Sequence, residues 1–215
     1  MDRIGPDLFR LTSGGFAAPH LVMGDVPTLI DAGTAGRGVA IQRELEAAGI
    51  RVERIILTHG DPDHAGGSDH LRQVTGATVY ASVAERPLLD RSGWPSLPPL
   101  RRTLMRVMFR GVPPPTVDTW LDGPTVIAGV EVIPTPGHTP GHIALWWQGW
   151  LMAGDALVSG ERFRESIWPF TIDRATARRS IETLVSRSPT GISSSHGRPA
   201  DRAAERLQAL VATWR

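Results

Sequence analysis

The first half of the chain alternates short apolar runs with helical patterns, which favours an α/β fold. The segment 38–49 carries apolar residues at helical spacing and ends in Gly49, so it predicts an amphipathic helix. Another helix is predicted from about His64 to Val74. The strand predicted over Val52–Thr58 has a continuous apolar centre, which is typical of a strand buried on both faces. The other predicted strands of this half are Leu8–Thr12, Phe16–Met23, Thr28–Ile30 and Ala77–Ala81.

The second half repeats this order of strands and helices. Asp173 is a suitable N-cap for a helix that runs to about Ser186, and a last helix is predicted from about Ala200 to Thr213. The predicted strands are Thr116–Leu121, Thr125–Ile127, Val130–Ile133, Ile143–Trp147, Trp150–Ala153 and Thr190–Ser194.

Between the halves, residues 85–118 form a proline-rich segment with one predicted helix, Leu100–Phe109. This helix carries Arg101, Arg102, Arg106 and Arg110 against Leu104, Val107, Met108 and Phe109. One interpretation is a solvated basic face over an apolar stripe that faces the core. The other is a lid over a functional site, since connections of this length are uncommon without a role. A helix on a membrane surface is a weaker third option.

The composition excludes several kinds of chemistry. The 215 residues fit one domain, and their net charge of +1 argues against a dedicated nucleic-acid binder. Every basic residue is Arg and there is no Cys, which excludes lysine Schiff bases, thiol nucleophiles and thiolate-bound metals. We recognise no targeting segment and no membrane span, so we expect a cytoplasmic protein. The chemistry is left to seven His and 22 carboxylates.

The densest group of these side chains follows the strand that ends near residue 58. Four of them lie within six residues, namely His59, Asp61, Asp63 and His64. The carboxyl end of a strand is where α/β proteins bind ligands. We expect His59, Asp61 and Asp63 on one face, because alternate side chains of an extended segment point the same way. On its own, this segment is also compatible with a polar loop that binds no metal.

Three later segments strengthen the metal interpretation. Each places a His or Asp at the carboxyl end of an apolar run: His138 in the turn 134–142, Asp155 after a strand, and His196 after the last strand. Such ends share a crevice in α/β folds. The sequence therefore predicts a metal site built from nitrogen and oxygen ligands.

These motifs, in this order, resemble those of the metallo-β-lactamase superfamily of binuclear metallohydrolases. The matching segments are Leu29–Gly33, the His-x-x-x-Asp-His loop at 59–64, the Gly-His turn at 137–138, Gly154-Asp155 and His196-Gly197. The resemblance extends from Phe16 to His196. It implies a four-layer αββα sandwich as a single domain over residues 1–215, with the helical segment at about 85–118 as an insertion.

The resemblance also implies roles for individual residues. It places His59, Asp61 and His138 in a first metal site, Asp63, His64 and His196 in a second, and Asp155 as the bridge between them. Asp31 is expected to orient the ligand loop rather than bind metal. His142 is expected to brace its turn, and His20 and His70 receive no role.

Position 61 departs from the common family motif, which has a histidine there. Asp61, Asp63, Asp155 and a bridging hydroxide balance the charge of two divalent ions, whereas a histidine at this position would leave one positive charge. A carboxylate favours harder ions, and flavodiiron proteins of the same superfamily also carry an acidic residue there. Two divalent ions are expected, zinc first, with iron or manganese as alternatives. Replacing Asp61 by histidine is expected to tighten zinc retention.

The resemblance implies a metal-dependent hydrolase that uses a metal-bridging hydroxide on a small ester, lactone or thioester. Asp63 would pass the proton to the leaving group. Two alternatives remain open: a persulfide-dioxygenase-like enzyme with one iron on His59, His138 and Asp155, and a metal-stabilised binding protein without catalysis. The expected partner is a small-molecule substrate, neither nucleic acid nor a membrane span is expected, and a homodimer is an open option.

Overall fold

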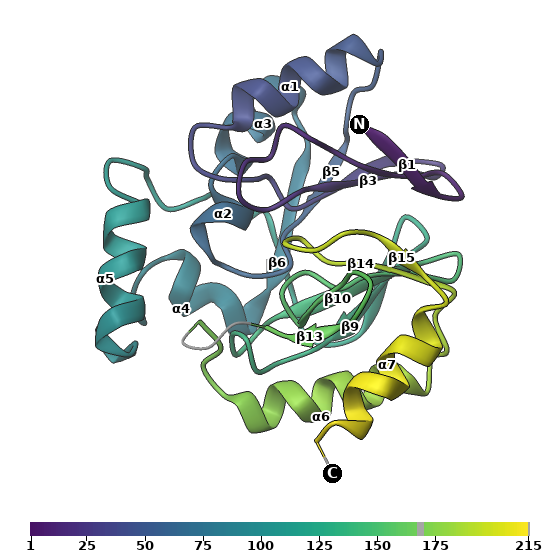
Figure 1. Ribbon diagram of the computed structural model, residues 1–215. Helices are drawn as coiled ribbons and strands as arrows, with labels where there is room; N and C mark the ends of the chain where they lie inside the picture. The colour runs from purple at the N-terminus through teal and green to yellow at the C-terminus, as the bar shows by residue number, and fades with distance from the viewer. Residues whose placement is uncertain (167–169, 215) are drawn as a thin grey trace. The chain divides into compact units, whose positions relative to one another are not determined.

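Each half of the chain folds around a β-sheet of its own (Figure 1). The computed structural model describes residues 1–166 and 170–214. It divides the chain into unit 1, Met1–Asp122, and unit 2, Gly123–Arg215. The boundary falls between the last strand of one sheet and the first strand of the other.

Unit 1 contains a seven-stranded sheet whose strands follow in chain order. Strands β1 to β4 pair antiparallel, and β4 to β7 pair parallel. The parallel part directs the carboxyl ends of β4, β5 and β6 to one edge. The strands are β1 Asp2–Gly5, β2 Leu8–Arg10, β3 His20–Met23, β4 Pro27–Ile30, β5 Arg54–Ile56, β6 Thr78–Ser82 and β7 Thr119–Leu121.

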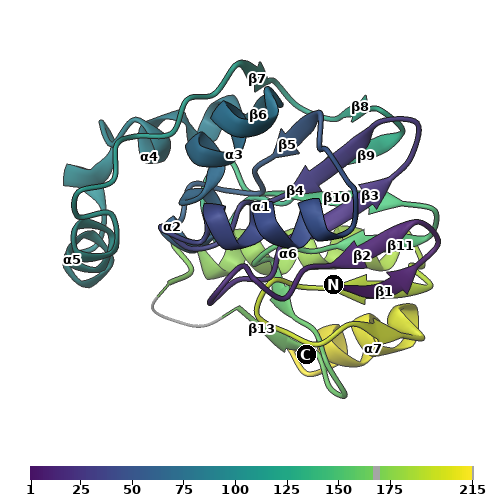
Figure 2. The same cartoon turned by 90° about the horizontal axis from the view of Figure 1, so that it is seen from above.

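Helices α1 (Gly38–Ala47) and α3 (Ser68–Thr75) contact each other and lie on one face of this sheet (Figure 2). Ile41 of α1 and Leu71 of α3 are buried in a core that includes Ile55 of β5. The apolar residues whose spacing predicted these helices therefore form the face that packs on the sheet.

The single helix predicted from His64 to Val74 is wrong, because α2 (Pro62–Ala65) and α3 are separate helices. Gly66 and Gly67 lie between them, where the chain passes close to another backbone segment. A Cβ on Gly66 would lie 2.2 Å from the nitrogen of Ala35, and one on Gly67 would lie 2.3 Å from the carbonyl oxygen of Ala32. Only glycine fits at both positions.

The segment 85–118 has a small core of its own. It contains α4 (Arg86–Leu89) and α5 (Pro99–Met108). The short 3₁₀ turn η1 (Val83–Glu85) precedes α4, and η2 (Trp94–Ser96) lies between the two helices. Figures 1 and 2 show α5 at the rim of unit 1, away from its sheet. Its buried apolar residues are Leu88, Trp94, Leu97, Met105 and Phe109.

The helix predicted in this segment is confirmed to within one residue at each end, but its predicted faces are partly wrong. Arg101 is 2% exposed, so it does not belong to a solvated basic face, and Val107 is 66% exposed. Phe109 of the predicted stripe is buried as expected, and it is joined by Met105, which was not predicted.

Unit 2 contains a six-stranded sheet in the order β15-β14-β11-β10-β9-β8, and a separate pair, β12-β13. Helices α6 (Arg174–Val185) and α7 (Ala203–Ala212) contact each other and share a core with Leu151 and Ile192 of the sheet. The strands are β8 Thr125–Ile127, β9 Val130–Pro134, β10 Ile143–Trp147, β11 Trp150–Met152, β12 Leu157–Val158, β13 Arg164–Glu165, β14 Gly191–Ser193 and β15 Ala200–Asp201.

The predicted start of α6 is confirmed, because the Asp173 carboxylate accepts a hydrogen bond from the Thr176 N–H at 3.0 Å. The predicted start of the last helix at Ala200 is wrong. Ala200 and Asp201 pair with β14 as a short strand, and α7 begins only after the left-handed Arg202.

The helices of the described residues are all short. The longest, α6, has 12 residues, against roughly 20 needed to cross a bilayer. Within residues 1–166 and 170–214, no helix is long and apolar enough to span a membrane.

Candidate metal centre

The loop after β5 carries the first group of predicted ligands. Asp61 is extended, with φ −75° and ψ 149°, and serves as the N-cap of α2, whose first residue is Pro62. This follows from the sequence, since the residue before proline avoids helical geometry and proline suits the first helical position. Asp63 and His64 lie within α2, so the prediction that Asp63 continues an extended face with His59 and Asp61 is wrong.

Asp31, which follows β4, organises this loop. Its Oδ1 accepts hydrogen bonds from the Thr58 N–H at 2.8 Å and the Thr58 hydroxyl at 3.0 Å. Its Oδ2 lies 2.8 Å from Nδ1 of His64. Burial alone would raise the pKa of the Asp31 carboxyl, but the charge and hydrogen bond of His64 outweigh it and hold that pKa below its usual value. These contacts support the prediction that Asp31 orients the loop of the proposed ligands.

The same network fixes which nitrogen of each histidine carries its lone pair. The Thr58 hydroxyl donates to Asp31, so it accepts at 3.0 Å from Nδ1–H of His59. Asp31 accepts from Nδ1–H of His64 in the same way. When the two imidazoles are neutral, this pattern leaves Nε2 of each as the acceptor nitrogen, and the ring centroids are 4.0 Å apart.

Each Nε2 faces a carboxylate of the same loop. Nε2 of His59 lies 3.6 Å from Oδ2 of Asp61, and Nε2 of His64 lies 3.9 Å from Oδ2 of Asp63. Both separations are too long for a hydrogen bond. Two ligands of one tetrahedral cation lie about 3.4 Å apart when the bonds are about 2.0–2.1 Å long. The donor set thus has the chemistry and spacing that a divalent metal needs.

Unit 2 presents a matching arrangement around His138. The turn that follows β9 is closed by a hydrogen bond from the Thr135 N–H to the His142 carbonyl oxygen at 2.8 Å. Nδ1 of His138 lies 3.1 Å from the Ser166 hydroxyl, and its Nε2 lies 3.7 Å from Oδ2 of Asp155. His138 therefore resembles His59, with Nδ1 engaged and Nε2 facing a carboxylate.

Asp155 and His196 are brought together by neighbouring parallel strands. Asp155 follows β11 and His196 follows β14, which pair in register. The Ser195 N–H donates to the Gly154 carbonyl oxygen at 3.1 Å, so the two loops are joined directly before the two predicted ligands. Nε2 of His196 lies 3.2 Å from Oδ2 of Asp155, the same oxygen that faces His138.

The remaining histidines have structural contacts. The bracing role of His142 is confirmed, because Nδ1 contacts the Thr135 hydroxyl at 2.8 Å and Nε2 accepts from the Asp155 N–H at 3.0 Å. His70 contacts the Gln42 side chain at 2.8 Å. His20 is buried, and burial, followed by the nearby Arg10 charge, lowers its pKa to about 3.

The sequence comparison decides the family. The profile of the metallo-β-lactamase superfamily matches residues 22–196. The chain belongs to the metallo-β-lactamase superfamily. The match covers both units and every predicted ligand, and membership implies divalent metal ions.

Several relatives in this superfamily have printed names. YobT of Bacillus subtilis, named as an uncharacterized protein, is 30% identical over 86% of this chain and 84% of its own length. YflN of the same organism, named a probable metallo-hydrolase, is 30% identical over 80% of this chain and 75% of its own length. Hydroxyacylglutathione hydrolase of Methylobacillus flagellatus is 32% identical over 53% of this chain, a match that spans only 37% of that enzyme.

Solved structures confirm the predicted α/β fold of the metallo-β-lactamase type. TTHA1623, crystallised in a di-iron-bound form, has a TM-score of 0.75 at 23% identity, over 92% of this chain and 96% of its own. The metallo-β-lactamase MIM-1 of Novosphingobium pentaromativorans has a TM-score of 0.73 at 25% identity, over 99% of this chain and 87% of its own.

The sequence analysis assigned no site role to two residues that contact the loop at 59–64. Glu85 is fully buried and accepts a hydrogen bond from the Gly60 N–H at 2.7 Å. Arg101 of α5 pairs through Nη2 with Oδ1 of Asp61 at 2.5 Å. Nothing in the sequence distinguished Arg101 from the other arginines of α5, because the distinction is burial.

Proposed function

We propose that this chain is a metal-dependent hydrolase of a small ester, lactone or thioester. The observation that carries the proposal is a pattern shared by His59, His64 and His138. In each of them Nδ1 is held by an oxygen, while Nε2 faces a carboxylate at 3.6–3.9 Å. This arrangement supports a metal-ligand set over a polar loop without a metal.

The proposed ligands come from both units, as superfamily membership supports. They are His59, Asp61 and His138 for one ion, Asp63, His64 and His196 for the other, and Asp155 as the bridge. Zinc fits this set of imidazoles and carboxylates. The di-iron form of TTHA1623 keeps iron as an alternative, because that protein shares the fold.

When bound, the two ions supply a water of lowered pKa and stabilise negative charge on the reacting carbonyl. The residues of the chain orient the ligands and move the proton. Asp63 is less buried than His64 and Asp31, so we assign it the transfer of a proton to the leaving group. The Asp31 network holds His64 in the tautomer that presents Nε2.

The substrate proposal rests on relatives. Hydroxyacylglutathione hydrolases from several bacteria match this chain at about 30% identity, and an acylglutathione is a thioester. The chain spans less than half the length of these three enzymes. The proposal is therefore the chemical class, acyl transfer from an oxygen or sulfur leaving group to water.

The first experiment measures metal content and turnover together. We expect about two divalent ions per chain in the purified protein and hydrolysis of at least one member of a panel of aryl esters, lactones and acylglutathiones. Asp63→Asn should lower kcat by about 100-fold or more, as loss of a general acid does. His138→Ala should lower both metal content and turnover.

His70→Ala is the matched control, because His70 is bound to Gln42 and belongs to no proposed ligand set. It should leave metal content and turnover unchanged. One iron per chain with oxygen uptake on a persulfide would replace hydrolysis by a redox function. Bound metal without turnover on the whole panel would favour a binding protein.

A further inference from the structure

We propose that Asp61 and Arg101 act as one unit that takes the place of a single histidine ligand, with Arg101 as the positioning residue. The inference rests on the proposed metal site and concerns how this chain accommodates an aspartate at position 61. It assigns a role to the segment 85–118, because Arg101 lies on α5 of that segment.

The geometry divides the two oxygens of Asp61 between two tasks. Oδ1 pairs with Nη2 of Arg101 at 2.5 Å, and Oδ2 faces Nε2 of His59 at 3.6 Å. A carboxylate that is held through one oxygen presents the other oxygen most readily to a cation. Arg101 therefore sets the direction of Asp61 as a ligand with one donor atom, as partners of metal ligands commonly do.

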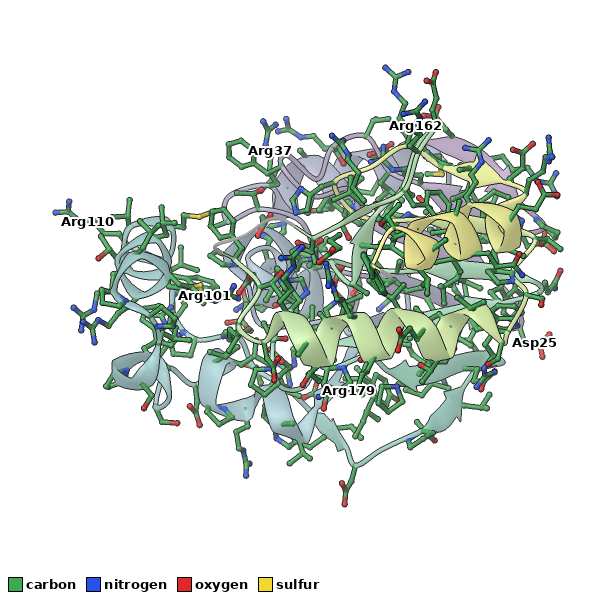
Figure 3. All side chains as sticks on the ribbon, turned by 60° about the horizontal axis from the view of Figure 1, so that its bottom comes forward. Asp25, Arg37, Arg101, Arg110, Arg162 and Arg179 are labelled. Carbon is green, nitrogen blue, oxygen red and sulfur yellow. The ribbon has the colours of Figure 1, made fainter. Side chains whose placement is uncertain are left out.

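Burial makes this pair a constraint. The side chain of Arg101 is 2% exposed and that of Asp61 is 11% exposed. Charge-assisted contacts of this length are strong, and they are poorly screened by solvent when buried. Figure 3 shows Arg101 on the side of α5 toward the rest of unit 1 and Arg110 on the opposite side, pointing away.

The charges show why the two residues belong together. A neutral imidazole contributes one donor atom and no charge. A carboxylate contributes one donor atom and one negative charge, and a guanidinium cancels that charge. The Asp61–Arg101 pair thus offers the metal the same donor number and the same net charge as the histidine found there in the common motif.

The pairing also connects α5 to the metal site. The ion pair requires α5 to be docked, because Arg101 reaches Asp61 from a position 40 residues later in the chain. If docking of α5 strengthens metal binding, then bound metal stabilises the docked position of α5 by the same free energy. This is a specific form of the lid interpretation, in which the closed segment supports the ligand.

The test is a cycle of four proteins: wild type, Asp61→His, Arg101→Gln and the double variant. Each is loaded with zinc, and the chelator concentration that removes half of the zinc is measured by metal analysis. Arg101→Gln should lower retention by about 10- to 100-fold, because Asp61 loses its orientation. Asp61→His should lower retention at least as much, because it leaves the buried guanidinium facing a cation.

The double variant distinguishes the pair from two separate effects. It should hold zinc at least as well as wild type, since a histidine needs no counter-charge. The gain expected for Asp61→His from the better match of zinc to an imidazole than to a harder carboxylate should appear only when Arg101 is also replaced. A double variant that is no better than either single variant would overturn the proposal.

Arg102→Gln is the matched control, because Arg102 is the next residue of α5 and its guanidinium donates to the Pro95 carbonyl oxygen at 2.9 Å. It should retain zinc as wild type does, and an equal loss would show that any change in α5 has this effect. Melting of the metal-free proteins establishes that all variants fold. A wild type that binds no zinc, iron or manganese overturns the proposed function itself. A metal-binding wild type with additive variants overturns only the pair.

Discussion

At the scale of single residues, the proposed site depends on hydrogen bonds to Nδ1 of the histidine rings that are proposed as ligands. Asp31 contacts both Thr58 and His64, and Thr58 contacts His59, so one carboxylate sets two imidazoles. Asp31 has a φ of 62°, a left-handed conformation that Asp tolerates better than most residues. The sequence predicted the orienting role from its place in a motif, and the contacts explain it.

We expect Asp31→Asn to lower metal affinity by about 10- to 100-fold, because the amide has only one accepting oxygen and no negative charge. Its NH2 group cannot accept a hydrogen bond from Nδ1–H of His64 or from Thr58. Competition with a fluorescent chelator measures this. Asp69→Asn is a suitable control. Among the hydrogen bonds described, the Asp69 carboxylate accepts one from the Thr116 N–H at 2.8 Å, which lies outside the loop of the proposed ligands. An unchanged affinity in Asp31→Asn would show that Thr58 alone orients the rings.

Residues that the sequence analysis missed share a physical cause. The loop residues were predictable because four side chains that can bind metal lie within six residues of the sequence: His59, Asp61, Asp63 and His64. Glu85 and Arg101 act on this loop from 25 and 40 residues away, and only the folding of the segment 85–118 brings them there. Long-range packing of this kind leaves no periodic pattern in the sequence.

At the scale of elements, the turn that carries His138 is hydrogen-bonded to the backbone directly before α6. The Asp173 N–H donates to the Gly137 carbonyl oxygen at 2.9 Å, and the Ile172 N–H donates to that of His138 at 3.1 Å. Gly137 has a φ of 134°, and a Cβ there would lie 2.2 Å from the nitrogen of Ala177. The position of His138 thus depends on glycine at 137.

Gly137→Ala should therefore lower the free energy of unfolding by about 2 kcal/mol or more, through backbone strain and overlap with backbone atoms of α6. Urea unfolding followed by tryptophan fluorescence measures this. Gly123→Ala is the control for strain alone, because Gly123 also has a positive φ, 93°, but no neighbour within 4 Å of the added Cβ. Equal losses in the two variants would show that the close approach to α6 contributes nothing.

The element boundaries show which parts of the fold periodicity predicts. The cores of α1, α6 and β10 were predicted because apolar residues repeat at the spacing of one buried face. The break between α2 and α3 and the short strand β15 were not, since each depends on contact with a distant backbone segment. Strands of two residues, such as β12 and β13, are too short to carry a pattern.

At the scale of the whole molecule, the superfamily match and the solved structures cover both units, and the α/β fold follows from them. The proposed ligands are divided between unit 1 and unit 2. Motif order along the chain predicted this division, because both groups follow strand ends. The identity of the metal is set by finer geometry than motif order carries.

Metal removal should therefore affect both units at once. We expect saturating zinc to stabilise the folded chain by about 4 kcal/mol at a free concentration 1,000-fold above Kd. Hydrogen exchange followed by mass spectrometry should show increased protection in the loop 58–66 and in the loops at 135–142, 154–156 and 194–197. Protection confined to one unit would contradict the shared ligand set, and a chelator-treated sample is the reference.

The ion pair between Asp61 and Arg101 has a consequence for how such a chain changes over generations. The two positions lie 40 residues apart in the chain, yet a substitution at either one leaves the other buried charge without this partner. If the pair replaces a histidine, the two sequence states are separated by intermediates that hold metal poorly. Homologues should then divide into two groups at these positions, with few chains carrying half of the exchange.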